Sequence, residues 1–203
     1  SMKVRGIEAR RRDTPPWIVE TQTKMLERLS RASSVKELPA CLGAAFEIFS
    51  KALADLRAGQ VPLEKLVITA RVSHELEAYR SPTPAARAAM QIFKETGKKA
   101  RPGQKIRFIF TRGEAGVRAW ELPGKIDPEV VDRVKYIELF ARAAASVFHP
   151  FGISDEQLKQ WAHTQTLALD LDLPKEASHV RKVYPHVRPG GIERAVGAGR
   201  FAG

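Results

Sequence analysis

The sequence contains a single cysteine, Cys41, among 203 residues. One cysteine excludes a disulfide within the chain and a zinc site built on cysteine pairs, and it is typical of an intracellular protein. Because no histidine lies near it in the sequence, we expect Cys41 to be a small residue of a helical core and not a nucleophile.

Long apolar runs are lacking as well. No stretch approaches the run of about 18 apolar residues that a transmembrane helix needs. The first residues are polar and basic, and no apolar segment of a signal peptide follows them. We therefore expect a cytoplasmic protein without membrane association.

Catalytic motifs are also missing. The sequence has neither of the glycine-rich phosphate-binding patterns, GxxxxGK[ST] and GxGxxG, and no Ser-His-Asp arrangement. The five histidines lack metal-ligand spacing, so we expect them at the surface or at helix ends. Asp170 and Asp172 could bind a divalent ion, but an exposed face of a strand explains their alternation more simply. We predict no catalytic residue, no metal site and no cofactor in this chain.

Positive charge, in contrast, is abundant. The 34 Lys and Arg against 23 Asp and Glu give a net charge of +11, and a surface of this sign attracts polyanions such as nucleic acid. The cations gather in the run Arg10 to Arg12, around Arg80, in the turn 97–105 and in the tail beyond Pro174. Because zinc-finger spacing, stacked-aromatic motifs and a homeodomain-like helix are missing, we expect contact with the phosphate backbone and not with the bases.

The apolar pattern predicts an α+β fold that is mostly helical. Amphipathic helices are indicated over 15–32, 34–58 and 128–150, with a short one over 154–163. In the first of them, Ile18, Gln22, Met25 and Leu29 lie on one stripe. Thr83 and Pro84 are a helix-start signal, and Gly97 is the matching stop signal.

Strands are predicted over 3–13, 66–72 and 105–112, because these segments are β-branched or alternate in polarity. In the last of them we expect Ile106, Phe108 and Phe110 to face inward, and Lys105, Arg107 and Ile109 to face outward. The longest helix should bury the stripe Val130, Val134, Ile137, Ala141, Ala144 and Phe148.

Four segments in a fixed order resemble the C-terminal part of archaeal-type family B DNA polymerases. They are RGIEARRRDTPPWIVETQTKMLERL, VPLEKLVITARVSHELEAYRSPTPAARAA, ARPGQKIRFIF and VKYIELFARAAASVFHPFGI. The resemblance implies the edge of the palm over 1–14 and a helical thumb with a small β element over 15–155. Residues 156–203 have no counterpart in it, and their composition predicts a C-terminal extension with a basic Gly/Arg-rich tail. A thumb of this family holds the primer–template duplex by its sugar-phosphate backbones, without sequence specificity.

The resemblance also implies which residues contact DNA. Carried over by position, they are Arg5, Gly6, Glu8, Arg11, Arg12 and Asp13 at the palm–thumb junction, Tyr79, Arg80 and Pro84 in a loop, and Arg101, Pro102 and Gly103 in a turn. The cationic clusters and the helix start add Arg10, Thr83, Lys98, Lys99 and Lys105 as expected DNA contacts. Ala85 and Lys135 depart from the family pattern, which often has His and Tyr at these positions.

The resemblance further implies what lies outside this chain. The aspartates that bind magnesium in a parent polymerase are not part of the matching region, so we expect the chain not to polymerise DNA alone. Its implied partners are duplex DNA and the remaining polymerase domains, in the same or a separate chain, and its implied location is the nucleoid. An alternative is a small assembly subunit of a split polymerase that docks on the catalytic chain, with residues 3–13 adding a strand to the partner's palm. A third interpretation is a basic helical protein unrelated to polymerases.

Overall fold

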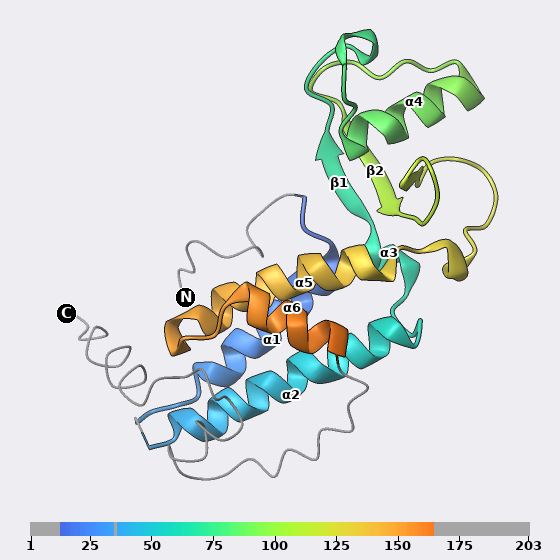
Figure 1. The fold of residues 1–203 in the computed structure, drawn as a ribbon. Helices are drawn as coiled ribbons and strands as arrows, with labels where there is room; N and C mark the ends of the chain where they lie inside the picture. Colours follow the sequence, from blue (N-terminus) through green and yellow to red (C-terminus); the bar gives the residue numbers. More distant parts are fainter. Residues whose placement is uncertain (1–12, 35, 165–203) are drawn as a thin grey trace. The chain divides into compact units, whose positions relative to one another are not determined.

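The computed structural model describes residues 13–34 and 36–164 (Figure 1). The helices are α1 (Pro16–Leu29), α2 (Leu38–Arg57), α3 (Leu63–Leu66), α4 (Pro84–Thr96), α5 (Arg133–Phe148) and α6 (Asp155–Thr164), and the short 3-10 helices are η2 (Leu76–Ala78), η3 (Pro128–Val130) and η4 (His149–Phe151). The strands are β1 (Ile68–Arg71), β2 (Lys105–Phe110) and β3 (Val117–Ala119). The predicted α+β, mostly helical fold is confirmed. The strand expected over 3–13 and the basic tail lie outside the described residues.

The described chain contains two compact units. The helical unit includes residues 20–54 and 137–164, and the sheet unit includes residues 13–19 and 55–136.

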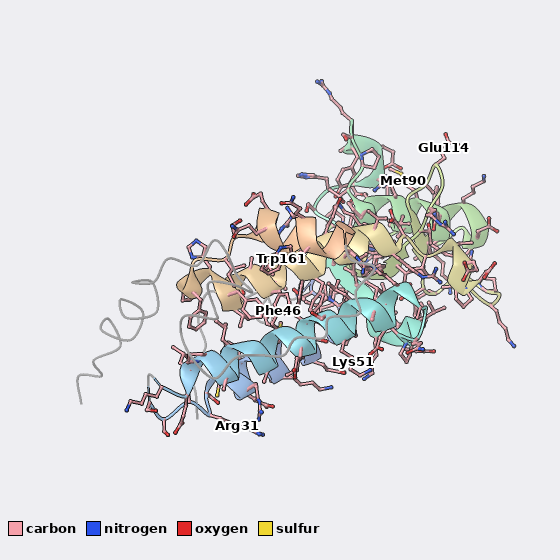
Figure 2. All side chains as sticks on the ribbon, turned by 60° about the horizontal axis from the view of Figure 1, so that its bottom comes forward. Arg31, Phe46, Lys51, Met90, Glu114 and Trp161 are labelled. Atoms are coloured by element: carbon pink, nitrogen blue, oxygen red, sulfur yellow. The ribbon has the colours of Figure 1, made fainter. Side chains whose placement is uncertain are left out.

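The helical unit is built around contacting aromatic side chains. The ring of Phe49 in α2 lies 5.0 Å from that of Phe140 in α5 and 5.7 Å from that of Phe46. Phe46 in turn meets Trp161 of α6 edge-on, with 5.1 Å between the ring centroids (Figure 2). These contacts join three helices around one core, while Cys41 of α2 is only partly buried.

A buried amide joins α1 to α5 in the same unit. Gln22 lies on the stripe predicted for α1 and is 0% exposed. Its Nε2 donates to the carbonyl of Ala143 at 2.7 Å and to Oγ of Ser146 at 2.7 Å. Because an unpaired buried amide is costly, these bonds favour one alignment of α1 on α5.

The sheet unit holds three antiparallel strands in the order β1-β2-β3. One face of the sheet is buried through Ile68, Ile106, Phe108, Val117 and Ala119, and α4 contacts all three strands. Gln91 of α4 donates to the carbonyl of Val117 and accepts from the N–H of Ala119. This side chain therefore closes the outer edge of β3, which would otherwise present free backbone groups.

Tyr136 connects the segment before β1 to the end of β2 in the sheet unit. Its hydroxyl donates to the carbonyl of Leu66 at 2.8 Å and accepts from the N–H of Phe110 at 3.1 Å. The side chain is 0% exposed, and burial raises the pKa of Tyr136 well above its ordinary value. The hydroxyl is therefore neutral in the folded protein over the whole physiological pH range.

Replacing Tyr136 by Phe is expected to lower the free energy of unfolding by about 1–3 kcal/mol at neutral pH, because two buried backbone groups lose their partner. The raised pKa makes this contribution complete below pH about 10 and smaller above it, since the unfolded state then loses its proton first. Urea denaturation of both proteins at neutral pH and at about pH 11 should show a smaller difference at the higher pH. A difference that grows with pH would contradict this role of Tyr136.

Two predictions about side-chain direction are wrong. Ile109, expected to face outward on β2, is 0% exposed, and its neighbour Phe108 is 2% exposed. Because successive residues of a strand point to opposite faces, both faces of β2 are covered at this level. Val130 and Val134, expected to be buried, are 37% and 55% exposed, since Val130 lies in η3 and Val134 in the first turn of α5. The rest of that predicted stripe is buried.

Candidate nucleic-acid interface

Two loops meet at one end of the sheet unit. One follows β1 and the other precedes β2, so antiparallel pairing brings them together. The N–H of Val72 donates to the carbonyl of Gln104 at 3.0 Å, and the N–H of Gly103 donates to the carbonyl of Val72 at 2.7 Å. We call residues 71–83 and 97–105 the tip, which includes the last residue of β1 and the first residue of β2. Figure 1 shows the two loops of the tip beyond the ends of these strands.

The segment RPGQ, residues 101–104, forms a tight turn in the tip. The N–H of Gln104 donates to the carbonyl of Arg101 at 3.0 Å, and Gly103 has a φ of +84°. Proline at the second position and glycine with positive φ at the third are what a type II turn favours. The Oε1 atom of Gln104 also accepts from the N–H of Arg101 at 3.0 Å. The turn is thus held from both sides, and it presents an exposed Arg101 side chain to solvent.

Tyr79 holds the other loop of the tip. Its hydroxyl oxygen accepts hydrogen bonds from the N–H groups of Ser73 at 2.8 Å and His74 at 3.1 Å. Burial acts to raise the pKa of Tyr79, but these hydrogen bonds outweigh it, so the pKa lies below its ordinary value. The loop conformation that carries Arg80 therefore depends on the Tyr79 hydroxyl.

Thr83 and Pro84 set the start of α4, as the sequence predicted. The Thr83 hydroxyl accepts from the N–H of Ala86 at 3.3 Å, and Pro84 occupies the first helical position, where no N–H is needed. Gly97 ends the helix with a φ of +70°. The cap fixes the direction in which the chain leaves the loop of Arg80.

The tip carries six cationic side chains against two carboxylates, a formal excess of four. The cations are Arg71, Arg80, Lys98, Lys99, Arg101 and Lys105. The Nζ atom of Lys99 lies 2.8 Å from Oε1 of Glu77 and 3.5 Å from Oε2 of Glu75. The hydrogen bond with Glu77 raises the pKa of Lys99, and the same bond lowers the pKa of Glu77. The charge of Lys99 is therefore compensated within the tip.

Four other cations of the tip are available to an external anion. Arg80, Lys98, Arg101 and Lys105 are exposed, and their side chains make no ion pair or hydrogen bond with any residue that the structure describes. An anion can bind them without displacing a protein partner, and arginine forks match the oxygens of a phosphate. The tip is thus suited to contact a chain of phosphates.

The positive surface continues from the tip along the sheet. In the strand register, Thr69 lies opposite Arg107, Arg71 opposite Lys105, and Ile109 opposite Arg118. Residues opposite one another share a face, so the four cations lie on the face turned away from the buried one. We call Thr69, Arg71, Lys105, Arg107, Arg118 and Trp120 the open sheet face.

The arginines of the open sheet face are oriented by the protein. Nε of Arg107 donates to Oε1 of Glu121 at 2.8 Å, and a terminal nitrogen of Arg118 donates to the carbonyl of Pro123 at 2.9 Å. Arg71 donates in the same way to the carbonyl of Gly103 at 3.1 Å. Each guanidinium has five N–H donors, so several of them stay available for a ligand.

The structure brings one group of the predicted contact residues together. Those in the tip are Tyr79, Arg80, Thr83, Lys98, Lys99, Arg101, Gly103 and Lys105, and Pro84 follows the tip as the first residue of α4. Asp13 is exposed and belongs to the same unit, while Arg5, Gly6, Glu8 and the run Arg10 to Arg12 lie outside the described residues. Sequence reasoning did not select Arg71, Arg107 or Arg118 as site residues. The alternation of β2, which does point Arg107 outward, was the available signal.

The described residues offer no ligand set for a metal ion. Residues 13–34 and 36–164 contain no group of three or more His, Cys, Asp or Glu side chains close enough to bind one. The magnesium implied by the resemblance therefore does not fit this part of the chain. In the same ranges, no helix is both long and apolar enough to span a membrane.

Known proteins match most of the chain. The family model described as DNA polymerase family B matches residues 1–159. The DNA polymerase of Thermococcus aggregans is 33% identical over 175 residues, which cover 84% of this chain and 9% of that protein. DNA polymerase 2 of Aeropyrum pernix is 30% identical over 164 residues, which cover 80% of this chain and 19% of that protein. This chain therefore spans less than a quarter of the length of these relatives.

A solved structure supports the fold. The family B DNA polymerase of Pyrobaculum calidifontis matches with a TM-score of 0.51 and 19% identity, over 78% of this chain and 18% of that one. At this identity the match supports the fold alone.

Proposed function

Because this chain belongs to DNA polymerase family B, we propose that it forms the thumb of such an enzyme and holds duplex DNA by its sugar-phosphate backbones. The observation that carries this proposal is the tip, where four exposed cations lie on two adjoining segments and their side chains pair with no residue among 13–34 and 36–164. Contacts with phosphates fix the position of a protein on DNA without reading its sequence.

The proposal assigns separate roles along the chain. Residues 1–14 connect to the palm, residues 15–155 form the thumb, and residues 156–203 are an extension. The junction residues Arg5, Gly6, Glu8, Arg10, Arg11, Arg12 and Asp13 add contacts to the duplex. Nucleotidyl transfer with magnesium belongs to the other polymerase domains, which are the protein partner of this chain near the nucleoid.

The ion pairs of Lys99 provide a first test. Replacing both Glu75 and Glu77 by Gln removes two negative charges from the tip and frees Lys99 for a phosphate. The slope of the logarithm of the binding constant against the logarithm of the salt concentration should then become more negative by about 0.9. This change raises the affinity roughly eightfold at 0.1 M salt. Fluorescence anisotropy of a labelled duplex, titrated at several salt concentrations, measures both quantities.

The matched control removes two carboxylates elsewhere. Glu47 lies on α2, and Glu114 lies in the turn after β2, at the other end of that strand from the tip. The double variant Glu47→Gln and Glu114→Gln makes the same change in net charge, and it should leave the slope as it is. Equal effects of both double variants would show that only the net charge matters and would exclude the tip as the contact.

A further inference from the structure

The open sheet face contains an open pocket of about 450 Å³. Thr69, Arg107 and Trp120 line it, together with Val67 and Glu64. This volume falls within the range of about 300–1,000 Å³ that is usual for sites of small organic groups. The pocket therefore has room for a planar group, and polar atoms of its lining can contact the edge of that group.

Trp120 is placed by the sheet. Its backbone N–H donates to the carbonyl of Arg107 at 2.9 Å and so continues the pairing of β2 with β3 beyond Ala119. The indole is partly exposed and its N–H has no acceptor among the described residues, whereas Trp17 of the same unit is 7% exposed. A large aromatic ring left partly open between cations is the arrangement that proteins use to stack nucleobases.

The polar groups of the pocket suit an unpaired nucleotide. Arg107 is held at Nε by Glu121, so its terminal N–H groups can meet a phosphate. The Glu64 carboxylate would repel a phosphate but can accept a hydrogen bond from an exocyclic amino group of a base. The pocket thus separates a base-binding part from a phosphate-binding part.

Stacking on Trp120 requires an unpaired base. In a duplex both faces of each base are covered by its neighbours, and only an unstacked base offers a face to an aromatic ring. Arg71 and Lys105, which belong to the tip, extend the positive charge of this face beyond the pocket, and such a row of cations suits the phosphates of an extended single strand. Resting on the proposed DNA-binding function, we propose that Trp120 and Arg107 form a binding site for an unpaired nucleotide of single-stranded DNA, separate from the duplex contacts of the tip.

The test compares the unmodified 203-residue chain with Trp120→Ala and Trp120→Phe on two labelled probes, a short deoxycytidine oligonucleotide, whose bases carry an exocyclic amino group, and a blunt-ended duplex. Anisotropy should show about tenfold weaker binding of the oligonucleotide by Trp120→Ala, because base–aromatic stacking is lost. Trp120→Phe should retain most of the affinity, since a smaller ring remains. Duplex binding should be the same for all three proteins.

A second measurement locates the base directly. An oligonucleotide that carries 5-iodocytosine should crosslink under ultraviolet light to the peptide that contains Trp120, as identified by mass spectrometry. Crosslinks confined to other peptides would overturn the site even if Trp120→Ala fails to fold.

The outcomes separate this inference from the proposed function. If the chain binds the duplex but Trp120→Ala leaves its binding of the oligonucleotide unchanged, the assignment of the nucleotide site is wrong and the thumb function stands. If the oligonucleotide depends on Trp120 and duplex does not bind, the site is right and the duplex-holding function is wrong. A chain that binds neither probe overturns both.

Discussion

Duplex DNA is expected to bind roughly 500-fold more weakly at 0.1 M salt when Lys98, Arg101 and Lys105 are all replaced by alanine. Each neutralised phosphate contributes a salt slope of about −0.9, which is a factor of about eight at this concentration. Three lost contacts therefore also reduce the slope by about 2.7. Anisotropy titrations over a range of salt concentrations measure the affinity and the slope in one experiment.

The control for this variant removes three cations from the helical unit. Lys24 and Arg28 are exposed on α1 and Arg31 is exposed just after it, so their replacement by alanine makes the same change in net charge. The slope of this control should equal that of the unchanged protein. Equal losses in both triple variants would contradict a localised contact at the tip.

Replacing Phe49 by alanine is expected to lower the free energy of unfolding by about 3–5 kcal/mol. Phe49 is 1% exposed, and its ring meets those of Phe46, Phe140 and Phe148. Its removal leaves a cavity between α2 and α5 that neighbouring rings cannot fill without leaving their own contacts. Urea denaturation followed by circular dichroism measures the change.

Phe93 provides the matched control for this substitution. It is 44% exposed on α4, so Phe93→Ala removes the same atoms from a position that faces water. Its effect should stay within about 0.5 kcal/mol. A loss of stability in Phe93→Ala as large as that in Phe49→Ala would contradict the assignment of the aromatic core.

Local signals in the sequence predicted most elements of the fold. The apolar stripe of α2 has helical spacing, and Thr83 with Pro84 and Gly97 gave the start and end of α4, because these signals act within a few residues. The stripe of α1 even included Gln22, although its partners on α5 lie 121 and 124 residues away. Periodicity shows that such a residue faces the core, but it does not show which groups form hydrogen bonds with its amide.

The wrong or missing predictions concern residues whose burial or strand pairing depends on tertiary contacts. Alternation along β2 assigns Ile109 to the solvent side, yet the chain covers that level of the sheet from both faces. Strand β3 has only three residues, Val117–Ala119, too few to show alternation, and it depends on its pairing with β2 and on the Gln91 side chain.

The candidate site shows the same difference between features that local sequence signals predict and features that depend on tertiary contacts. The sequence pointed to Arg80, Lys98, Lys99, Arg101 and Lys105 in the tip, but the pairing of Lys99 with Glu77 depends on the distance between two loops that are separated in the sequence. Arg118 and Trp120 join the open sheet face only through the register of β3 on β2. No local pattern contains that register, so sequence reasoning could not select them.

The most direct test of the thumb function is the binding of the unmodified 203-residue chain to two duplexes of equal length and unrelated sequence, over a range of salt concentrations. We expect equal affinities and a linear plot of the logarithm of the binding constant against the logarithm of the salt concentration. Its slope should be about −3.6 or steeper, with one phosphate for each of Arg80, Lys98, Arg101 and Lys105. Absence of binding at low salt, with copurification on a polymerase large chain, would contradict the thumb function in favour of the docking subunit. Strong preference for one sequence would contradict contact through the backbone.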